Sequence, residues 1–410
     1  MNSYTVYLIM SFCSSLFFMV CFTVNLIYQA TVVNLDPLQM VLVGTVLEIT
    51  TFVLEVPTGV VADLKSRRLS ILIGYVLLGL GFLLEGSFPV FWAVIGAQVL
   101  WGTGWTFSSG AEEAWVADEL GEGRVGEAFL RGSQAGNLGG LLGIPISVLL
   151  GRLDLALPIV ISGICMIGLA AFLTLAMQEK PFRSSQTLEQ TAWKSMGETI
   201  RMAWTLMKQH SLVLVLILAS MVFGLSSEGF DRLTTPHLID NVGFPEWGSF
   251  EPVVWFGVIQ AVNQGLNLVA VELVRRGVDL RKPMQIANAL IIFSVLMVMI
   301  LVAFALAKGF WLAVMLLWGF GILKVSCDPL YDTWFNGQIR DPNIRATLFS
   351  VRAQMNAFGQ IAGGPFVGAI GKWLSLRAAL LTSGLLLSPI VVLYGIGRRL
   401  EKREVIENDA

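Results

Sequence analysis

Long apolar runs alternate with short polar stretches along the chain, and this alternation predicts membrane-spanning helices. About 20 apolar residues at roughly 1.5 Å each are needed to cross about 30 Å of hydrocarbon. The first half contains six such runs, over residues 6–31, 38–62, 69–86, 90–117, 126–151 and 155–178. The second half contains six more, over residues 211–236, 250–275, 283–306, 310–336, 343–371 and 375–397. The predicted fold class is an all-α polytopic membrane protein.

The longest polar stretch lies between the two sets of runs and predicts the domain organisation. We expect an N-terminal six-helix bundle over 1–178, a cytoplasmic linker over 179–210, a C-terminal six-helix bundle over 211–397 and a cytoplasmic tail over 398–410. Within the linker, Trp193, Trp204 and Met207 fall at helical spacing beside Lys194 and Lys208. Such spacing is typical of an amphipathic helix, lying either on the membrane surface or packed under the two bundles.

An internal repeat relates the two halves. A Trp-Gly-x-Gly motif begins at Trp101 and again at Trp318. Further along each copy lies an acid-x-Trp motif, which ends at Trp115 in the first copy and at Trp334 in the second. A charged loop and a glycine- and proline-containing segment complete each copy, at residues 143–145 and 363–365. Duplicated helical halves are the architecture of many carriers, in which the substrate site lies between the halves near the middle of the membrane.

The composition supports a membrane protein and excludes several other classes. Hydrophobic residues make up 55% of the chain and charged residues 14%, whereas about a quarter of the residues of a soluble domain are charged. The chain contains no basic tract of the kind that binds nucleic acid. It also contains no glycine-rich loop of the kind that binds the phosphates of ATP. The four cysteines lie within apolar runs without metal-ligand spacing, so we expect them to be small buried side chains. We therefore expect no cofactor, no metal and no enzymatic activity.

The distribution of positive charge predicts the orientation. If the N-terminus is cytoplasmic, most of the 27 Lys and Arg residues lie on the cytoplasmic side, and Lys324 falls within a helix. Those on the outside are then only Arg152, Arg232, Lys308, Lys372 and Arg377. Because Lys and Arg accumulate in cytoplasmic loops, we expect both termini in the cytoplasm and the protein in the inner or plasma membrane.

The loop between the second and third predicted helices carries a short motif. It consists of Gly59, Asp63 four residues later, and then Arg67 and Arg68. Glycine permits a close helix approach, and the acid and the arginines can hold the cytoplasmic side shut through charge-assisted hydrogen bonds. Asp118, at the inner end of the fourth helix, is a further candidate partner. Alternatively, the arginines only enforce the orientation.

This loop resembles the motif of the major facilitator superfamily. Leu64 and Ser66 depart from it, because the family usually has a basic residue straight after the acid and a glycine before the arginines. The resemblance implies two pseudo-symmetric six-helix bundles and secondary transport. It also implies gating residues at Gly59, Asp63, Arg67, Arg68 and Asp118.

The fifth predicted helix resembles that of drug:proton antiporters, because it is rich in glycine and contains proline. The residues are Gly136, Gly139, Gly140, Gly143 and Pro145, with Ile144-Pro145 replacing the usual Gly-Pro pair. Small residues permit close helix crossing and proline permits a bend, so tight packing explains the pattern equally well. The segments 55–59 and 227–232 add a resemblance to macrolide and tetracycline efflux pumps.

Ionisable side chains within the predicted spans are the candidate binding and proton-coupling groups, because a charge in hydrocarbon is costly unless it faces a cavity or a partner. Glu48 and Lys324 fall near the middle depth of their helices and are the leading candidates. Lys324 could instead form a permanent pair with Asp328, one turn away. The remaining candidates for substrate or proton binding are Glu55, Asp328, Glu228, Asn137, Asn263 and Asn356. Glu112 and Glu113 are candidate gate or rim residues, Glu55 can belong to the gate as well, and Glu228 can pair with Arg232.

These patterns lead to one leading hypothesis and two alternatives. The hypothesis is a monomeric carrier that exports a small amphipathic molecule in exchange for protons by alternating access. The first alternative is a proton symporter or facilitator that imports a nutrient. The second is a membrane receptor or lipid-handling protein that transports nothing. The lipid bilayer, a small-molecule substrate and protons are the expected partners.

Overall fold

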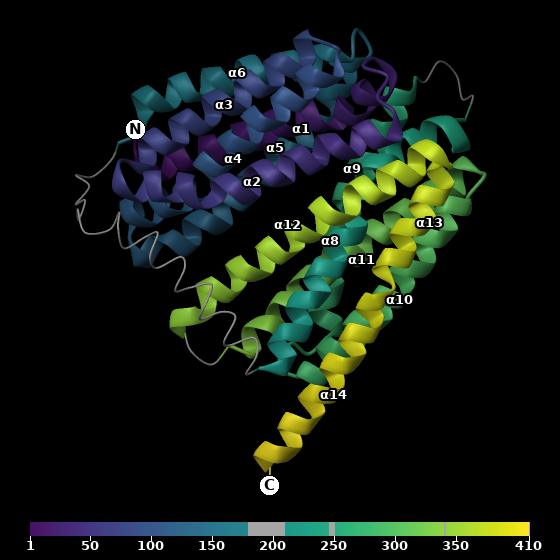
Figure 1. Cartoon of the computed structure of the whole chain (residues 1–410). Coiled ribbons are helices and arrows are strands. Elements are labelled where there is room, and N and C mark those ends of the chain that lie inside the picture. The colour runs from purple at the N-terminus through teal and green to yellow at the C-terminus, as the bar shows by residue number, and fades with distance from the viewer. Residues whose placement is uncertain (179–209, 246–250, 340–341, 410) are drawn as a thin grey trace. The chain divides into compact units, whose positions relative to one another are not determined.

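Helices form all the regular secondary structure in the part of the chain that the structure describes. The computed structural model describes residues 1–178, 210–245, 251–339 and 342–409. The first six helices are α1 (Ser3–Thr31), α2 (Pro37–Leu64), α3 (Arg67–Ser87), α4 (Phe91–Leu120), α5 (Glu122–Gly151) and α6 (Ala156–Ala176) (Figure 1). The others are α8 (Ser211–His237), the π-helix η1 (Leu238–Val242), α9 (Pro252–Gly277), α10 (Pro283–Leu306), α11 (Phe310–Gly337), α12 (Pro342–Trp373), α13 (Leu376–Leu387) and α14 (Pro389–Asp409). The predicted all-α class is confirmed.

The helix ends follow local chemistry that is visible in the sequence. Asp36 accepts a hydrogen bond from the Gln39 amide while the Gln39 side chain accepts one from the Asp36 amide, which closes the start of α2. Ser66 caps α3 in a similar way through the Leu69 amide. These contacts satisfy amides that have no partner within the helix. The predicted range 283–306 agrees with α10 at both ends.

The last predicted span, 375–397, is found as one segment that can cross a membrane, Leu376–Arg403, but its helix differs from the prediction in two details. It is divided into α13 and α14 at Ser388, and α14 continues to Asp409 instead of ending at 397. The division follows from Pro389, which lacks an amide hydrogen and whose ring clashes with a continuous helix. The predicted linker helix of 179–210 falls almost wholly on 179–209, outside the described residues, so the linker and the domain boundaries stay predictions.

Ten helical segments among the described residues are long and apolar enough to cross a membrane. Two of the predicted spans, now α4 and α12, do not meet that criterion although they are 30 and 32 residues long. Glycine, hydroxyl and amide side chains lower their apolar character. A helix with such side chains is suited to pack against other helices more than against lipid.

The described chain forms two compact units, which are not simply its two halves. The first contains Met1–Gln39, Val46–Trp193 and Glu246–Ala261, and the second Met40–Thr45, Lys194–Pro245 and Val262–Ala410, each as far as the structure describes it. In the first unit α1 packs along α5, and α3 packs against α4 and α6. In the second, α8 packs along α12, and α10 packs against α11, α13 and α14. The same pairing recurs in each unit, as the internal repeat predicts.

Two buried tryptophans show the repeat at the level of single atoms. Trp115 of α4 and Trp334 of α11 are each 1% exposed. The Trp115 indole N–H donates to the carbonyl oxygen of Gln178, just beyond α6, at 2.9 Å. The Trp334 indole N–H donates to Oε2 of Glu401 in α14 at 2.8 Å. An indole N–H needs an acceptor when it is buried, and each unit supplies one from its last helical region.

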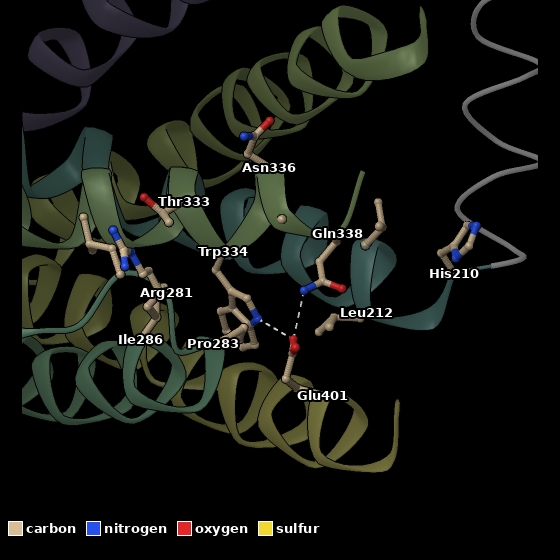
Figure 2. Close-up of a pocket in the computed structure, with 13 residues that line it drawn as sticks. His210, Leu212, Arg281, Pro283, Ile286, Thr333, Trp334, Asn336, Gln338 and Glu401 are labelled. Carbon is tan, nitrogen blue, oxygen red and sulfur yellow. Dashed lines mark hydrogen bonds between the residues drawn. The ribbon is translucent and has the colours of Figure 1, made fainter. Parts of the chain in front are cut away.

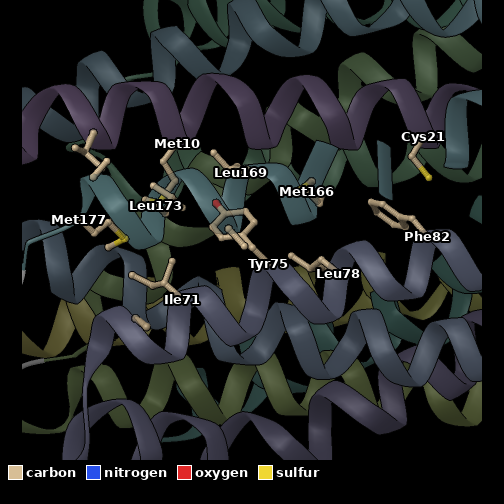
Figure 3. Packing of buried hydrophobic residues seen from close by; sticks show 14 of the residues in the cluster. Met10, Cys21, Ile71, Tyr75, Leu78, Phe82, Met166, Leu169, Leu173 and Met177 are labelled. Carbon is tan, nitrogen blue, oxygen red and sulfur yellow. The ribbon is translucent and has the colours of Figure 1, made fainter. Parts of the chain in front are cut away.

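An apolar cluster fills the interior of the first unit. Met10 of α1, Tyr75 and Phe82 of α3, and Met166 and Leu173 of α6 pack against one another and are at most 1% exposed (Figure 3). Such close contact gives dispersion energy that lipid chains alone would not replace with the same geometry. This packing fixes the position of α3, which carries polar groups at both ends.

Glycines allow the closest helix pairs to form. A Cβ at Gly143 of α5 would lie 2.8 Å from the Leu16 carbonyl oxygen of α1, and one at Gly136 would lie 2.9 Å from Ser15 Oγ. Gly139 faces the Phe12 carbonyl oxygen still more closely, whereas Gly140 has only Met19 Cε nearby, at 3.8 Å. Thus α5 packs on α1 through glycines, as expected, although Gly140 contributes little. Pro145 lies exposed within the unbroken α5.

Gly139→Ala should destabilise the protein because the new methyl group would meet the backbone of α1. Overpacking of this kind costs about 1–3 kcal/mol. The matched control is Gly168→Ala in α6, where a Cβ would have nothing within 4 Å. There the gain in helix propensity, up to about 1 kcal/mol, should leave stability unchanged or improved. Thermal unfolding in detergent measures both, and equal melting temperatures would contradict the packing assignment.

Candidate functional site

An ion pair joins α8 and α11 within the second unit. Lys324 Nζ lies 3.1 Å from Oδ2 and 3.3 Å from Oδ1 of Asp231. The Phe223 ring lies under the same ammonium group, at 5.9 Å. The side chains of Lys324 and Asp231 are 34% and 47% exposed, so the pair is not enclosed within the unit. The alternative of a permanent pair with Asp328 is not what the structure shows, because Lys324 points across to α8.

A second ion pair lies on the same helix and is enclosed. Glu228 Oε1 accepts a hydrogen bond from Arg232 Nε at 2.9 Å. Glu228 is 5% exposed. Gly44 lies against both side chains with no room for a Cβ, and a Cβ at Gly364 of α12 would lie 3.2 Å from Glu228 Cγ. The second unit thus holds one enclosed pair and one accessible pair on α8.

Acidic residues continue along α11 at four-residue intervals. Asp328 follows Lys324 by one turn and is exposed, and Asp332 follows Asp328 by another. Asp332 pairs with Arg352 of α12, whose guanidinium also lies 5.0 Å from the Tyr331 ring. The stripe offers a ligand both signs of charge on one helix face.

The three candidate asparagines have different surroundings. Asn356 donates to the Ser220 carbonyl oxygen at 2.9 Å and accepts from Gln360 at 2.8 Å. Its amide therefore joins α12 to α8, and a substrate role for it stays a prediction. Asn263 of α9 packs with its side-chain oxygen against Gly321 of α11. Asn137 of α5 is exposed.

Glu48 and Glu55 both lie on the part of α2 that belongs to the first unit. Glu48 is partly exposed and Glu55 is exposed. Both backbone carbonyls accept hydrogen bonds from threonine side chains further along α2. The proposed roles of the two carboxyl groups stay predictions.

Arg67 connects three helices of the first unit. Its guanidinium pairs with Asp118 of α4, donates to the Ala114 carbonyl oxygen at 2.8 Å and lies 3.9 Å from Asp63 of α2. Arg68 donates to the carbonyl oxygen of Thr174 in α6. The expected partners Asp63 and Asp118 are thus brought to Arg67.

The sequence analysis explained Gly59 by a close approach of the second helix to a neighbour. That explanation is wrong for the described part of the chain. Gly59 is exposed, and a Cβ there would have nothing within 4 Å. Glu112 lies in hydrogen-bonding contact with the Tyr75 hydroxyl in the interior, whereas Glu113 is exposed. The two neighbouring acids therefore face different surroundings, and their gating role stays a prediction.

A cavity of about 480 Å³ lies in the second unit, away from these ion pairs. It is formed by the starts of α8 and α10, the end of α11, and α14. Figure 2 shows Trp334 and Gln338 donating to Glu401 at its wall, at 2.8 and 2.9 Å. No candidate of the sequence analysis lines this cavity, and the indole of Trp334 and the amide of Gln338 in its wall already donate to Glu401. We therefore do not assign the transport site to it.

Two groups of residues escaped the sequence analysis. Asp231 lies in the seventh predicted span, 211–236, but its pairing with Lys324 was not predicted, because the partner depends on how two helices are rotated. The second group surrounds Glu85, which is 0% exposed on α3. The sequence contains a signal for this group, because Asn25, Gln29 and Gln98 are polar residues that interrupt apolar runs.

The comparisons with known proteins agree with this architecture. A sequence model of the Major Facilitator Superfamily matches residues 7–327. An uncharacterized MFS-type transporter of Bacillus subtilis (strain 168), YxaM, is 23% identical over 384 residues, which cover 90% of each chain.

Solved transporter structures share the fold. The nucleoside transporter NupG is 17% identical, with a TM-score of 0.76, over 98% of this chain and 100% of that one. A bacterial homologue of the human lysosomal transporter Spinster is 13% identical, with a TM-score of 0.75, over 98% of each chain. A POT family transporter in complex with a thioalcohol-conjugated peptide is 13% identical, with a TM-score of 0.72, over 96% of this chain and 95% of that one. With helices that can cross a membrane, an internal repeat and a family match over most of its length, the chain belongs to the major facilitator superfamily and is a multi-pass membrane transporter of that type.

Proposed function

We propose that this protein exports a small amphipathic molecule in exchange for protons, with the Lys324–Asp231 pair as the binding and coupling site. The proposal places it in the plasma membrane as a monomer with cytoplasmic termini. The proposal rests on a partly exposed ion pair between two helices of one unit. Its Lys324 Nζ and Asp231 Oδ2 atoms are 3.1 Å apart, and an aromatic ring lies beside it.

The chemistry of this pair suits a coupled carrier. Inside a membrane an ion pair is stable only while both partners remain together, because separating them leaves an unpaired charge at a cost of several kcal/mol. A substrate that bears a charged or polar group can replace one partner. A proton taken up by Asp231 then compensates for the loss of its contact with Lys324. Phe223 offers the apolar part of an amphipathic substrate a ring to pack against.

The direction of transport separates the proposal from its main rival. A symporter would use the same pair to import a nutrient, and nucleoside and peptide carriers share the fold. The glycine-rich α5 and the acids within the spans motivate export. A receptor that transports nothing would not need an accessible ion pair at all.

Transport in proteoliposomes with an imposed pH gradient tests the function. Candidate substrates are first selected by the rise in melting temperature that a ligand of the folded state produces. Substrate should then move in the direction opposite to the protons. The internal pH of the vesicles should change as substrate is transported. Uptake of substrate driven by inward proton movement would show a symporter instead of an exporter. If ligands that raise the melting temperature are not transported at all, the receptor hypothesis is favoured.

Neutralising the pair should abolish coupled flux while leaving the fold intact. Lys324→Met and Asp231→Asn should each lower proton-driven flux at least about tenfold, the factor that corresponds to about 1.4 kcal/mol. The matched control is Glu272→Gln, which removes an exposed ion pair with Arg275 on α9 and should leave flux unchanged. Wild-type flux in both variants would remove the pair from the mechanism.

The two substitutions should also be non-additive in stability. Each single variant leaves one charge without its partner, whereas the double variant leaves none. Thermal unfolding of the four proteins should therefore give a coupling energy above about 0.5 kcal/mol, as contacting residues do. Additive effects would mean that the contact contributes nothing in solution.

A further inference from the structure

The cavity of the second unit lies where four membrane-spanning helices begin or end. Its volume of about 480 Å³ is typical of small-ligand pockets, which measure about 300–1,000 Å³. The candidate spans of α8 and α10 begin beside it, at Ser211 and Pro283, and those of α11 and α14 end beside it, at Gly337 and Arg403. Because the ends of a span lie in the interfacial region of a bilayer, the cavity lies at the depth of the lipid headgroups.

Part of the cavity wall is apolar and closely packed. Leu212 and Val213 of α8 and Ile286 of α10 line it and are 2%, 3% and 1% exposed. A Cβ at Gly397 of α14 would lie 2.9 Å from the Trp334 ring of α11 and 3.2 Å from Leu212 Cδ1. The wall is therefore formed by close helix contacts, and it offers an apolar surface to a ligand.

Arg281 supplies a positive charge to the same cavity. It lies in the loop between α9 and α10 and is exposed. The nearby Asp279 carboxylate accepts a hydrogen bond from the Arg281 backbone amide at 3.1 Å and pairs with Lys282 Nζ at 3.4 Å. Among the described residues, no carboxylate forms an ion pair with the Arg281 guanidinium. This guanidinium is therefore available to an anion, and guanidinium groups bind phosphate through two parallel hydrogen bonds.

The acid that lines the cavity opposes an anion only weakly. The Glu401 side chain accepts hydrogen bonds from the Trp334 indole and the Gln338 amide at 2.8 and 2.9 Å (Figure 2). Glu401 is 6% exposed. Two donors thus offset its charge from within the wall, whereas the Arg281 guanidinium is open to the cavity.

Two helix starts add positive potential at this position. The capping residues of α8 and α10, His210 and Lys282, form no side-chain capping hydrogen bond. Amides at such a helix start carry partial positive charge and favour anions. The end of α11 has the opposite polarity, but the Gln338 amide already donates to the Phe335 carbonyl oxygen there. His210 lies at the opposite end of the lining from Arg281 (Figure 2), so the positive potential extends across the cavity.

We propose that this cavity binds the headgroup of an anionic phospholipid. Arg281 holds the phosphate, the starts of α8 and α10 add to the attraction, and the apolar wall contacts the adjoining part of the acyl chains. A cation beside an apolar wall at headgroup depth matches such a lipid, because basic pockets between membrane helices bind anionic headgroups. The predicted orientation places the site in the cytoplasmic leaflet. The site is separate from the Lys324–Asp231 pair and does not depend on the direction of transport.

Native mass spectrometry of the full chain tests the proposal by counting the lipid molecules that stay bound. With phosphatidylglycerol and phosphatidylcholine at equal concentration, the wild type should retain phosphatidylglycerol preferentially. Arg281→Gln should weaken this binding about fivefold, which corresponds to about 1 kcal/mol, the usual contribution of one cation at a membrane surface. The matched control is Arg403→Gln, which removes an exposed guanidinium at the same end of the spans but outside the cavity lining. Equal losses in the two variants would show attraction by general surface charge and overturn the site.

A second pair of variants tests the cavity without changing any charge. Gly337 lines the cavity, and a Cβ there would have nothing within 4 Å. Gly337→Leu should therefore fold and lower the binding of phosphatidylglycerol by taking up cavity space. Gly277→Leu, at the end of α9, has the same free space for a Cβ and should bind as the wild type does. Undiminished binding in Gly337→Leu would contradict the assignment of the lipid to this cavity.

Inorganic phosphate distinguishes a lipid headgroup from a soluble anion. In nanodiscs of phosphatidylcholine alone, added phosphate should leave the melting temperature unchanged. Replacing part of that lipid with phosphatidylglycerol should raise the melting temperature of the wild type more than that of Arg281→Gln, because only a ligand of the folded state stabilises it. A rise with phosphate in the wild type but not in Arg281→Gln would assign the cavity to a soluble phosphate and overturn the lipid. An equal rise with phosphatidylglycerol in both proteins would also contradict the proposal.

Discussion

In the hydrocarbon of a membrane no water completes the hydrogen bonds of a backbone or a buried side chain, so the protein must complete them itself. The backbone does so by forming helices throughout the described chain. The side chains do so by connecting helices to one another. Arg67 joins α2, α3 and α4, Glu85 joins α1, α3 and α4, and Lys324 joins α11 to α8. These polar contacts add to the apolar and glycine-mediated packing that holds each unit together.

Glycine and charge act together in this arrangement. Helices that approach closely at glycines, such as α5 on α1 or α12 on α8, bring polar atoms of different helices within reach of each other. The pair of Glu228 and Arg232 lies within α8, and it is enclosed because Gly44 of α2 and Gly364 of α12 leave space for the Glu228 side chain. The neighbouring pair of Asp231 on α8 and Lys324 on α11 is less enclosed, with side chains 47% and 34% exposed.

Much of the fold was predictable because apolar runs of sufficient length have few alternatives to a membrane helix. The ends of α10 and the recurrence of Trp115 and Trp334 followed from the sequence alone. The break at Pro389 was visible in the sequence but was overlooked, because an apolar run continues across it. The pair of Lys324 with Asp328 was only an alternative in the sequence analysis, and the structure shows Asp231 instead. Spacing along one helix suggests Asp328, whereas the rotation of two helices selects Asp231. Asn25, Gln29, Glu85 and Gln98 each looked like an isolated polar residue, and only the packing of three helices assembles them.

The contact between Glu401 and Trp334 has a practical meaning for work with this protein. The last few residues of most domains are poorly ordered and tolerate change unless contacts tie them down. Here the final helix returns a carboxylate to a buried indole and to Gln338. Shortened expression variants should therefore be cut beyond Glu401, since an earlier end point would leave the ring nitrogen of Trp334 with nothing to accept its hydrogen.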